Sequence, residues 1–551
     1  MCIVRHYYSS LVFIFAFISC VADPSSREAS ATYRGEIITN GKDLVVQTQS
    51  GKVAGYKEEG VYIFKGIPYA EADRFMPPRE PEPWEGVRSS RAYGPTSPQG
   101  FRSGWLSDTQ AFAFDWDDGY PGEDCLRINI WTPKTGNDKK RPVMVWLHGG
   151  GYAAGSGQEH PAYEGSNMAR RGDVVVVSLN HRLNVLGFLD LSAFGDKYAQ
   201  SGNVGLLDLV AALEWVKENI EQFGGDPNNV TLFGQSGGGG KVTTLMATPA
   251  AEGLFHKAIV QSGSLLRTME SKYSRRIGAA TIEELGLKAS QIEELQHIPY
   301  EQLLAAGNRA ITKVKEESLK EGFNIFLFNW SPTVDGNILP SQPFEGKAPE
   351  ISKNVPMMIG STLHEFMMSG WRPELKTLSR NEAKKELEKT YGKQTDRFLE
   401  AFARAYPDHT TADLFDVDFR FRPDAVRQAK MKHEQQGAPV YMYLFTWESP
   451  VLDYALRASH CMEIPFVFDN IYRSRSMTGG GKEAYVLAER MSTAWINFAR
   501  AGNPNTELLP EWPAFDPVDG ATMIFDNRCE IWNNHDQAVL QLIDTIPYRG
   551  L

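Results

Sequence analysis

The stretch VTLFGQSGG, residues 230–238, runs from a short apolar segment into a Gly-rich turn, and a helical pattern follows over residues 241–248. The apolar segment 230–233 has the length and composition of a buried strand. Ser236 therefore stands at a predicted strand-to-helix turn in the pattern G-x-S-x-G, where glycine neighbours leave the hydroxyl clear of the backbone. This context favours a serine nucleophile over an ordinary Gly-rich connection.

The glycines that follow Ser236, together with Lys241, also resemble part of a phosphate-binding loop. That motif requires glycine where Gln235 stands and a serine or threonine where Val242 stands. The phosphate-loop interpretation therefore fails.

A second glycine motif, HGGGY at residues 148–152, directly follows the apolar run 143–147. Loops of this type turn backbone N–H groups toward a developing oxyanion, and glycines permit the close approach. We expect Gly150 and Gly151 to donate from this loop and Gly237 to donate from the turn after Ser236. A flexible Gly-rich strand end would explain the HGGGY motif alone, but it does not explain the two motifs together in this order.

Alternating strand and helix patterns organise the N-terminal half of the chain. Residues 143–147, 174–179 and 230–233 read as buried strands, and residues 204–223 read as a crossover helix. This alternation predicts an α/β fold with a large, mostly parallel sheet covered by helices on both faces. The charged stretch 381–406 reads as helical with a solvated face.

Composition narrows the function classes. With 42% apolar residues in 551, the chain can bury a large core. Its net charge of −11 and its lack of a basic stripe argue against a nucleic-acid partner. No later segment approaches the roughly 20 apolar residues of a membrane span.

The N-terminus resembles a signal peptide over residues 1–22, with Arg5 before a short apolar run and small residues up to Ala22. We expect cleavage after Ala22, a flexible lead-in over 23–35, and a single catalytic domain over 36–551. The protein would then be exported, either secreted or periplasmic. Lipid anchoring through Cys20, which stands in a string loosely like a lipoprotein processing site, is a minority alternative.

Three cysteines remain beyond that leader, Cys125, Cys461 and Cys529, so at most one internal disulfide can form. Their spacing offers no CxxC pair and no clustered Cys/His ligand set, so we expect no metal site. We also expect no organic cofactor.

Taken together, the motifs resemble the type-B carboxylesterase/lipase family. The resemblance covers nearly all of residues 45–547 and extends to the strings FKGIPYA (64–70), EDCLRINIW (123–131) and GNVGLLD (202–208). Gln235 and the run of four glycines at residues 237–240 resemble the corresponding sequence in bacterial members of the family. The resemblance implies the α/β-hydrolase fold, with helical insertions forming the pocket over residues 99–120, 312–330 and 369–378.

The resemblance also supplies the partners of Ser236. In GSTLHEF, residues 360–366, it points to Glu365 as the acid, and in ASHCMEIPFVF, residues 458–468, it points to His460 as the catalytic base. The order nucleophile, acid, histidine is that of this fold. Ser262 resembles a serine that helps to position the acid.

The implied activity is hydrolysis of a small-molecule carboxylic ester through an acyl-enzyme on Ser236. Use of the same triad on an amide or lactone or in acyl transfer, and a non-catalytic adhesion-type relative, stay open as alternatives. The family's animal members pair the cysteine at Cys125, but here no upstream partner exists beyond the leader. Trp116 is expected to be a buried or rim aromatic and no choline site. The substrate's identity and the oligomeric state stay open.

Overall fold

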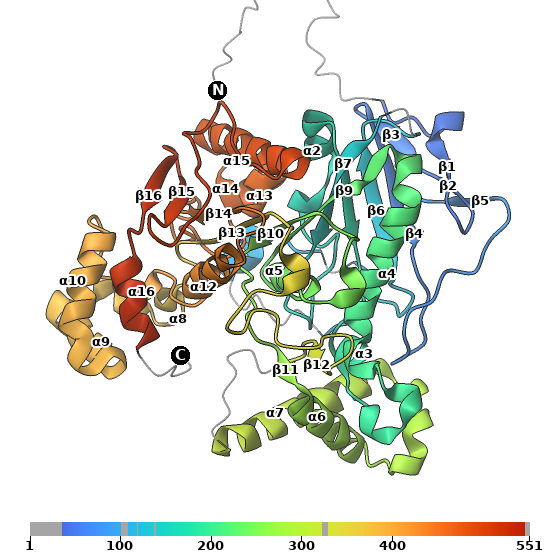
Figure 1. Cartoon of the computed structure of the whole chain (residues 1–551), viewed down its shortest axis with the longest axis horizontal. Coiled ribbons are helices and arrows are strands. Elements are labelled where there is room, and N and C mark those ends of the chain that lie inside the picture. Colours follow the sequence, from blue (N-terminus) through green and yellow to red (C-terminus); the bar gives the residue numbers. More distant parts are fainter. Residues whose placement is uncertain (1–35, 101–107, 118, 137–138, 322–328, 546–551) are drawn as a thin grey trace, which may run out of the picture. The chain divides into compact units, whose positions relative to one another are not determined.

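The apolar runs of the sequence meet in one large sheet in the computed structural model, which describes residues 36–100, 108–117, 119–136, 139–321 and 329–545 (Figure 1). Within these residues the sheet has 11 strands in the order β16-β15-β14-β13-β10-β9-β7-β8-β6-β4-β3. The strands are β3 (Tyr56–Glu58), β4 (Val61–Pro68), β6 (Arg127–Thr132), β7 (Arg141–Leu147), β8 (Val175–Leu179), β9 (Gly225–Gln235), β10 (Lys257–Gln261), β13 (Met357–Thr362), β14 (Val440–Phe445), β15 (Ala521–Phe525) and β16 (Glu530–Asn533).

The sheet is parallel in its centre and antiparallel at both ends. From β15 to β8 in the sheet order every neighbouring pair is parallel, which confirms the mostly parallel sheet that the sequence predicts. The pairs β15–β16, β8–β6, β6–β4 and β4–β3 are antiparallel. The carboxyl ends of the central parallel strands share one edge, and the loops that leave that edge build the site described below.

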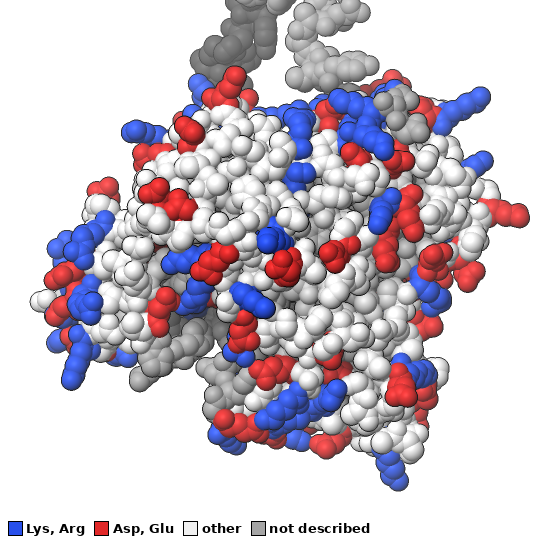
Figure 2. All heavy atoms as spheres, in the orientation of Figure 1, with Lys and Arg blue, Asp and Glu red and all other residues white. Residues whose placement is uncertain are grey.

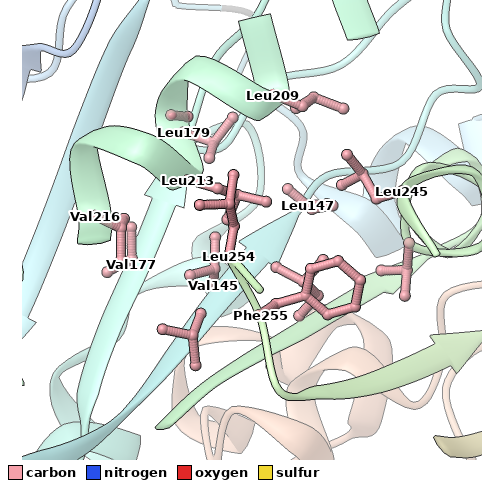
Figure 3. Packing of buried hydrophobic residues seen from close by; sticks show 14 of the residues in the cluster. Val145, Leu147, Val177, Leu179, Leu209, Leu213, Val216, Leu245, Leu254 and Phe255 are labelled. Carbon is pink, nitrogen blue, oxygen red and sulfur yellow. The ribbon is translucent and has the colours of Figure 1, made fainter. Parts of the chain in front are cut away.

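Strand β7 shows how the two faces of the sheet are filled. Val145 and Leu147 face a core made with helices α4 (Val204–Asn219), α5 (Gly237–Leu245) and α12 (Phe421–Glu434). Figure 3 shows this packing, with Val177 of β8 and Leu213 of α4 among the labelled side chains. The alternate residue Trp146 faces the opposite core, made with α2 (Ser166–Gly172), α13 (Ile464–Val467) and α15 (Lys482–Ala501). Each fully buried aliphatic side chain contributes about 1.5–3 kcal/mol to the free energy of unfolding.

The predicted elements are present, with one shifted boundary. Strands β7 and β9 contain the predicted runs 143–147 and 230–233, and β8 covers the run 174–179 except for Val174. Helix α4 with the 3-10 turn Ile220–Phe223 spans the predicted crossover helix. Helix α5, however, begins at Gly237, earlier than the predicted start at residue 241. Close packing explains why glycines form this first turn, since a Cβ on Gly238 would lie 1.9 Å from the carbonyl oxygen of Leu147.

Two helical groups lie outside these cores. Helices α6 (Ser271–Glu284) and α7 (Tyr300–Lys320) contact each other around one apolar cluster. Helices α9 (Arg380–Tyr391), α10 (Thr395–Ala405) and α16 (Gln537–Asp544) surround another. The predicted helical stretch 381–406 is thus two helices, which separate at Gly392, where φ is 51°.

Short elements complete the described fold. They are β1 (Val45–Gln47), β2 (Lys52–Ala54) and β5 (Val87–Ser89) in one small sheet, β11 (Met269–Glu270) and β12 (Thr333–Val334) in another, and the helices α1 (Asp108–Phe114), α3 (Asn184–Phe188), α8 (Met368–Trp371), α11 (Asp413–Asp416) and α14 (Arg475–Thr478).

Residues Ile37–Leu551 cluster as one compact unit by their contacts. The predicted signal peptide, residues 1–22, and the predicted lead-in, residues 23–35, lie outside the described residues. Among the helices that are described, none is both long and apolar enough to cross a bilayer. Acidic and basic side chains are interspersed over the face that Figure 2 shows.

Candidate active site

Ser236 lies between the end of β9 and the start of α5, in a strained backbone conformation. Its φ of 57° and ψ of −125° are unusual for a residue with a side chain, and such conformations cost about 1–3 kcal/mol each. Hydrogen bonds hold the turn in place. The Ser236 N–H donates to the Gln261 carbonyl of β10 (2.8 Å), and the Ser236 carbonyl accepts from the Gly240 N–H (3.0 Å). The neighbouring sheet and helix therefore impose the strain that lifts the serine out of the strand.

The predicted acid and histidine form a buried pair. Glu365 lies just after β13 and His460 lies before α13, and both are at most 5% exposed. Glu365 Oε2 contacts His460 Nδ1. The other carboxylate oxygen accepts from the Thr362 N–H (2.9 Å), and the His460 N–H donates to the Glu365 carbonyl (2.9 Å). This arrangement assigns the imidazole proton to Nδ1 and leaves Nε2 as the acceptor.

Contacts with neighbouring residues bring this pair to the serine turn. The side-chain amide nitrogen of Gln235, the residue before Ser236, lies 3.3 Å from His460 Nε2. The rings of Phe366 and Phe421 pack on the imidazole, with centroid separations of 4.5 Å and 5.4 Å. Both phenylalanines line the same cavity as Ser236. Ser236 therefore lines the cavity, and the buried Glu365–His460 pair lies behind the phenylalanines that line it.

The HGGG loop lies against the same turn. Gly150 and Gly151 have φ values of 79° and 63°, which glycine adopts without strain. A Cβ on Gly237 would lie 2.3 Å from the Gly151 nitrogen, so the backbone of the loop and the backbone of the turn are in direct contact. Gly151, Ser236 and Gly237 line the cavity together, and Gly150 precedes Gly151 on the loop. The predicted oxyanion donors are thus adjacent, while their roles stay a prediction.

The cavity at Ser236 has a volume of about 260 Å³ and mainly apolar walls. Of the three predicted pocket insertions, only 312–330 supplies lining residues within the described chain. The remaining lining residues come from the two glycine motifs, from Phe366 beside the predicted acid, and from segments that the sequence did not indicate, which are the loop after β10 and the start of α12. Besides the glycines and Ser236, the larger lining residues are Tyr152, Leu265, Arg267, Met269, Trp330, Phe366 and Phe421.

Two further carboxyl groups are buried close to the pair. Burial, together with the charge of Glu365, raises the pKa of Glu463 to about 7 and that of Asp418 to about 7. Three backbone N–H groups of residues 420–422 oppose this shift at Asp418. Below pH 7 these two groups are therefore largely neutral.

The remaining candidate residues lie near this site without joining it. Ser262 directly follows β10 with φ 48°, and its N–H donates to the Gly360 carbonyl (2.8 Å). Its buried hydroxyl has no hydrogen-bond partner within the described chain, so a role in positioning the acid stays a prediction. The ring of His364 lies 3.4 Å from Asp413 and that of His148 stacks on His181.

The three cysteines and Trp116 have structural surroundings in the described chain. Cys125, Cys461 and Cys529 are free thiols, and the first two are buried. Trp116 is 9% exposed and packs against His160, which confirms the expected buried aromatic. Among the described residues, no group of three or more His, Cys, Asp or Glu side chains could hold a metal ion.

Sequence reasoning missed the two phenylalanines that cover His460. Phe366 directly follows the predicted acid, so its position in the motif could have indicated it. Phe421 opens α12 at 39 positions before His460 and carries no local signal. Only the folded chain places its ring on the imidazole.

Comparisons with known proteins agree with this geometry. Residues 42–540 match the model of the carboxylesterase family. The para-nitrobenzyl esterase of Bacillus subtilis (strain 168) is 39% identical over 513 residues, which are 92% of this chain and 99% of the relative. The phenmedipham hydrolase of Pseudarthrobacter oxydans is 35% identical, over 87% of this chain and 94% of the relative.

Solved structures show the same likeness. An esterase from the anaerobe Clostridium hathewayi, described as able to hydrolyse aliphatic aromatic polyesters, superimposes with a TM-score of 0.81 at 38% identity. The match covers 93% of this chain and all of that one. A para-nitrobenzyl esterase structure gives a TM-score of 0.74 at 38% identity, over 91% of this chain and 99% of that chain. The mixed sheet with its flanking helices is therefore an α/β-hydrolase fold.

Proposed function

The chain belongs to the carboxylesterase family and is a carboxylic ester hydrolase, and we propose that it works through the triad Ser236, His460 and Glu365. One observation carries this proposal. A buried carboxylate holds Nδ1 of His460 beside the strained turn that presents Ser236 to an apolar cavity. A serine hydroxyl is a weak nucleophile unless a base of this kind accepts its proton.

In the acylation step, Nε2 of His460 removes the proton of the Ser236 hydroxyl while Oγ attacks the ester carbonyl carbon. Glu365 stabilises the imidazolium that forms and takes no proton itself. Collapse of the tetrahedral intermediate breaks the bond to the alcohol oxygen, which receives the proton from His460. The product of this step is an acyl group on Ser236.

Deacylation repeats these steps with water. His460 accepts a proton from the water molecule that attacks the acyl-enzyme, and the acid leaves as Ser236 regains its proton. In both steps the carbonyl oxygen becomes negative, and we expect the N–H groups of Gly150, Gly151 and Gly237 to donate to it. Removing one donor of this kind commonly costs a hundredfold or more in kcat.

We propose substrates with a sizeable apolar group next to the ester. The cavity walls support this choice because Leu265, Met269, Trp330 and Phe421 surround Ser236 and few polar groups face the space. Burial of apolar surface contributes about 25 cal/mol per Å² to binding such a group. Arg267, already paired with Glu270 (3.1 Å) and Glu345 (3.0 Å), is not free to bind an acid.

The test compares the protein with its Ser236→Ala variant on short- and long-chain p-nitrophenyl esters. We expect turnover by the parent protein, its loss in the variant, and a covalent organophosphate adduct at Ser236. Absence of both turnover and labelling in folded parent protein would favour a binding role instead.

A matched ester and amide with the same acyl group separates the alternatives that share this triad. We expect kcat/KM for the ester to exceed that for the amide by orders of magnitude. A preference for the amide would contradict the esterase proposal while leaving the triad in place.

We also propose that the protein is exported, with a leader that is cleaved after Ala22. The support is the sequence pattern of residues 1–22. Cell fractionation with N-terminal sequencing tests it, and a mature protein starting at Asp23 is the expected result. A lipid on Cys20 would favour the anchored alternative, and an intact N-terminus in the cytoplasm would contradict export.

A further inference from the structure

Lys241 is a buried cation directly behind the catalytic machinery. It lies on α5, five residues after Ser236, and its side chain is among the largest in the protein that are fully enclosed. No carboxylate of the described chain forms an ion pair with it. A buried ammonium without a counter-ion is costly, so a fold that keeps one must satisfy it in another way.

Backbone carbonyls of the HGGG loop accept hydrogen bonds from the Lys241 ammonium. Lys241 Nζ donates to the His148 carbonyl (2.8 Å) and lies 3.5 Å from the Gly149 carbonyl. His148 Nδ1 also contacts the Gly149 carbonyl (2.9 Å). Burial holds the pKa of His148 well below its usual range, so its ring is neutral and donates from Nδ1. The Gly149 carbonyl thus faces two donors on the side of Lys241.

The contact between Lys241 and the Gly149 carbonyl also affects the direction of the Gly150 N–H, a predicted oxyanion donor. The C=O and N–H of a trans peptide point in opposite directions, and the described chain contains no cis peptide. The Gly149 carbonyl and the Gly150 N–H belong to one such peptide. A lysine that draws the carbonyl inward therefore turns the Gly150 N–H away from itself, toward the opposite side of the loop.

We propose that Lys241 is a positioning residue for ester hydrolysis, whose ammonium fixes the HGGG loop and places positive charge behind the N–H groups that receive the oxyanion. This inference rests on the proposed role of that loop. Lys241 touches neither the substrate nor Ser236 in this role, because it acts through the loop backbone. Its charge matters most in the transition state, when the carbonyl oxygen becomes negative.

The surroundings set the pH range in which the charge is present. Burial lowers the pKa of Lys241 to about 7, while the negative charge of Glu159 opposes this shift. The other groups that face it are the neutral rings of His148 and His181 and the ring of Tyr152, whose centroid lies 5.8 Å from Nζ. Lys241 is therefore cationic below pH 7 and loses its charge as the pH rises above 7.

Lys241→Met tests the inference because methionine keeps most of the volume and removes the charge and the donors. Lys432→Met is the matched control. Lys432 is also buried and donates to a backbone carbonyl, that of Lys353 (2.9 Å), but it lies at the far end of α12 and does not line the cavity. We expect Lys241→Met to lower kcat by on the order of tenfold, with KM changed less than threefold and kcat of the control unchanged.

The pH profile separates positioning from a purely structural role. Both proteins keep the triad residues, so the quantity to follow is the ratio of kcat for the parent to kcat for Lys241→Met. We expect this ratio to be largest below pH 7 and to shrink as the pH rises through the pKa of Lys241. A ratio that is constant from pH 6 to pH 9 would show that the charge plays no part.

A kcat for Lys241→Met within twofold of the parent would overturn the inference. If that variant does not fold, Lys241→Gln, which keeps a neutral donor, is measured in the same way against the same limits. Failure of the proposed function looks different, since the parent protein would then show no turnover and no label on Ser236. An active parent with an equally active Lys241→Met removes only the inference about the lysine.

Discussion

At the scale of single residues, the site depends on groups held in unfavourable states. Ser236 has a backbone conformation that suits glycine better, and Glu365 is a carboxylate with 2% exposure. Neither state would persist in isolation, because each costs free energy that only the surrounding hydrogen bonds offset. The motif around Ser236 could be found in the sequence, but its strain and its surroundings could not.

Glu365→Gln tests the role of the acid. Glutamine preserves size and hydrogen bonding but can present an amide N–H to His460 Nδ1, which would favour the wrong tautomer. We expect kcat for p-nitrophenyl esters to fall by about 10³–10⁴-fold with the fold intact. Steady-state kinetics with a circular dichroism spectrum measures this, and a loss of less than tenfold would argue against Glu365 as the acid.

Glu463→Gln tests the buried carboxyl beside it. Because burial raises the folded-state pKa of Glu463 from 4.5 to about 7, its contribution to stability is complete below pH 4.5 and is lost as the pH rises to 7. Glutamine does not titrate and can still accept from Gln261 (3.2 Å in the parent). We expect the variant to exceed the parent in unfolding free energy at pH 8 and to lose this advantage by pH 5.

Urea denaturation of both proteins at several pH values measures that difference. A parallel pH dependence of the two proteins would mean that Glu463 titrates normally in the folded state.

At the scale of elements, helix α5 shows where local rules mislead. A run of four glycines disfavours a helix by about 1 kcal/mol per residue relative to alanine, which is why the predicted helix began only at residue 241. In the structure the helix starts at Gly237, and neighbouring backbone approaches Gly237, Gly238 and Gly239 too closely for a side chain. Tertiary packing overrides propensity here, and no pattern within the segment itself reveals it.

Gly238→Ala tests that explanation. The added methyl group would lie 1.9 Å from the Leu147 carbonyl, a backbone atom that cannot move without shifting β7. Gly240→Ala is the control on the same helix, since its methyl group would meet nothing closer than 3.6 Å. We expect the first variant to lose several kcal/mol of unfolding free energy and the control to lose little or gain slightly.

Chemical denaturation of the two variants checks this expectation. Equal stabilities would mean that the turn adapts to a side chain and that crowding does not explain why glycine occupies position 238.

At the scale of the whole molecule, the sequence predicts the central strands of the sheet better than the strands at its ends or the walls of the cavity. The runs in β7, β8 and β9 are continuous because parallel strands are buried on both faces, and such runs are easy to recognise. The antiparallel strands at the sheet ends and the helices that wall the cavity lack this signal. Trp330 and Phe421 line one space only because distant segments meet there.

The difference between the central sheet and the outer helices also predicts which regions unfold locally most readily. The central strands lie between two large cores, whereas α9, α10 and α16 pack around a smaller cluster of their own. Local stability follows the extent of buried packing. We expect native-state hydrogen exchange to be slowest in β7, β9 and β10 and clearly faster in α9 and α10. Equal protection throughout would indicate that the chain opens only as a whole.

The free thiols have a consequence for making the protein. Cys125 and Cys461 are enclosed, and burial raises the pKa of each thiol, so they stay protonated and unreactive in the folded state. Folding of the described part of the chain therefore requires no disulfide among these cysteines. The chain without residues 1–22, synthesised in a reducing bacterial cytoplasm, is expected to match the same chain made under oxidising conditions in specific activity and to tolerate dithiothreitol. A maleimide dye should react in the native protein with Cys529 at most, and with all three cysteines only after denaturation.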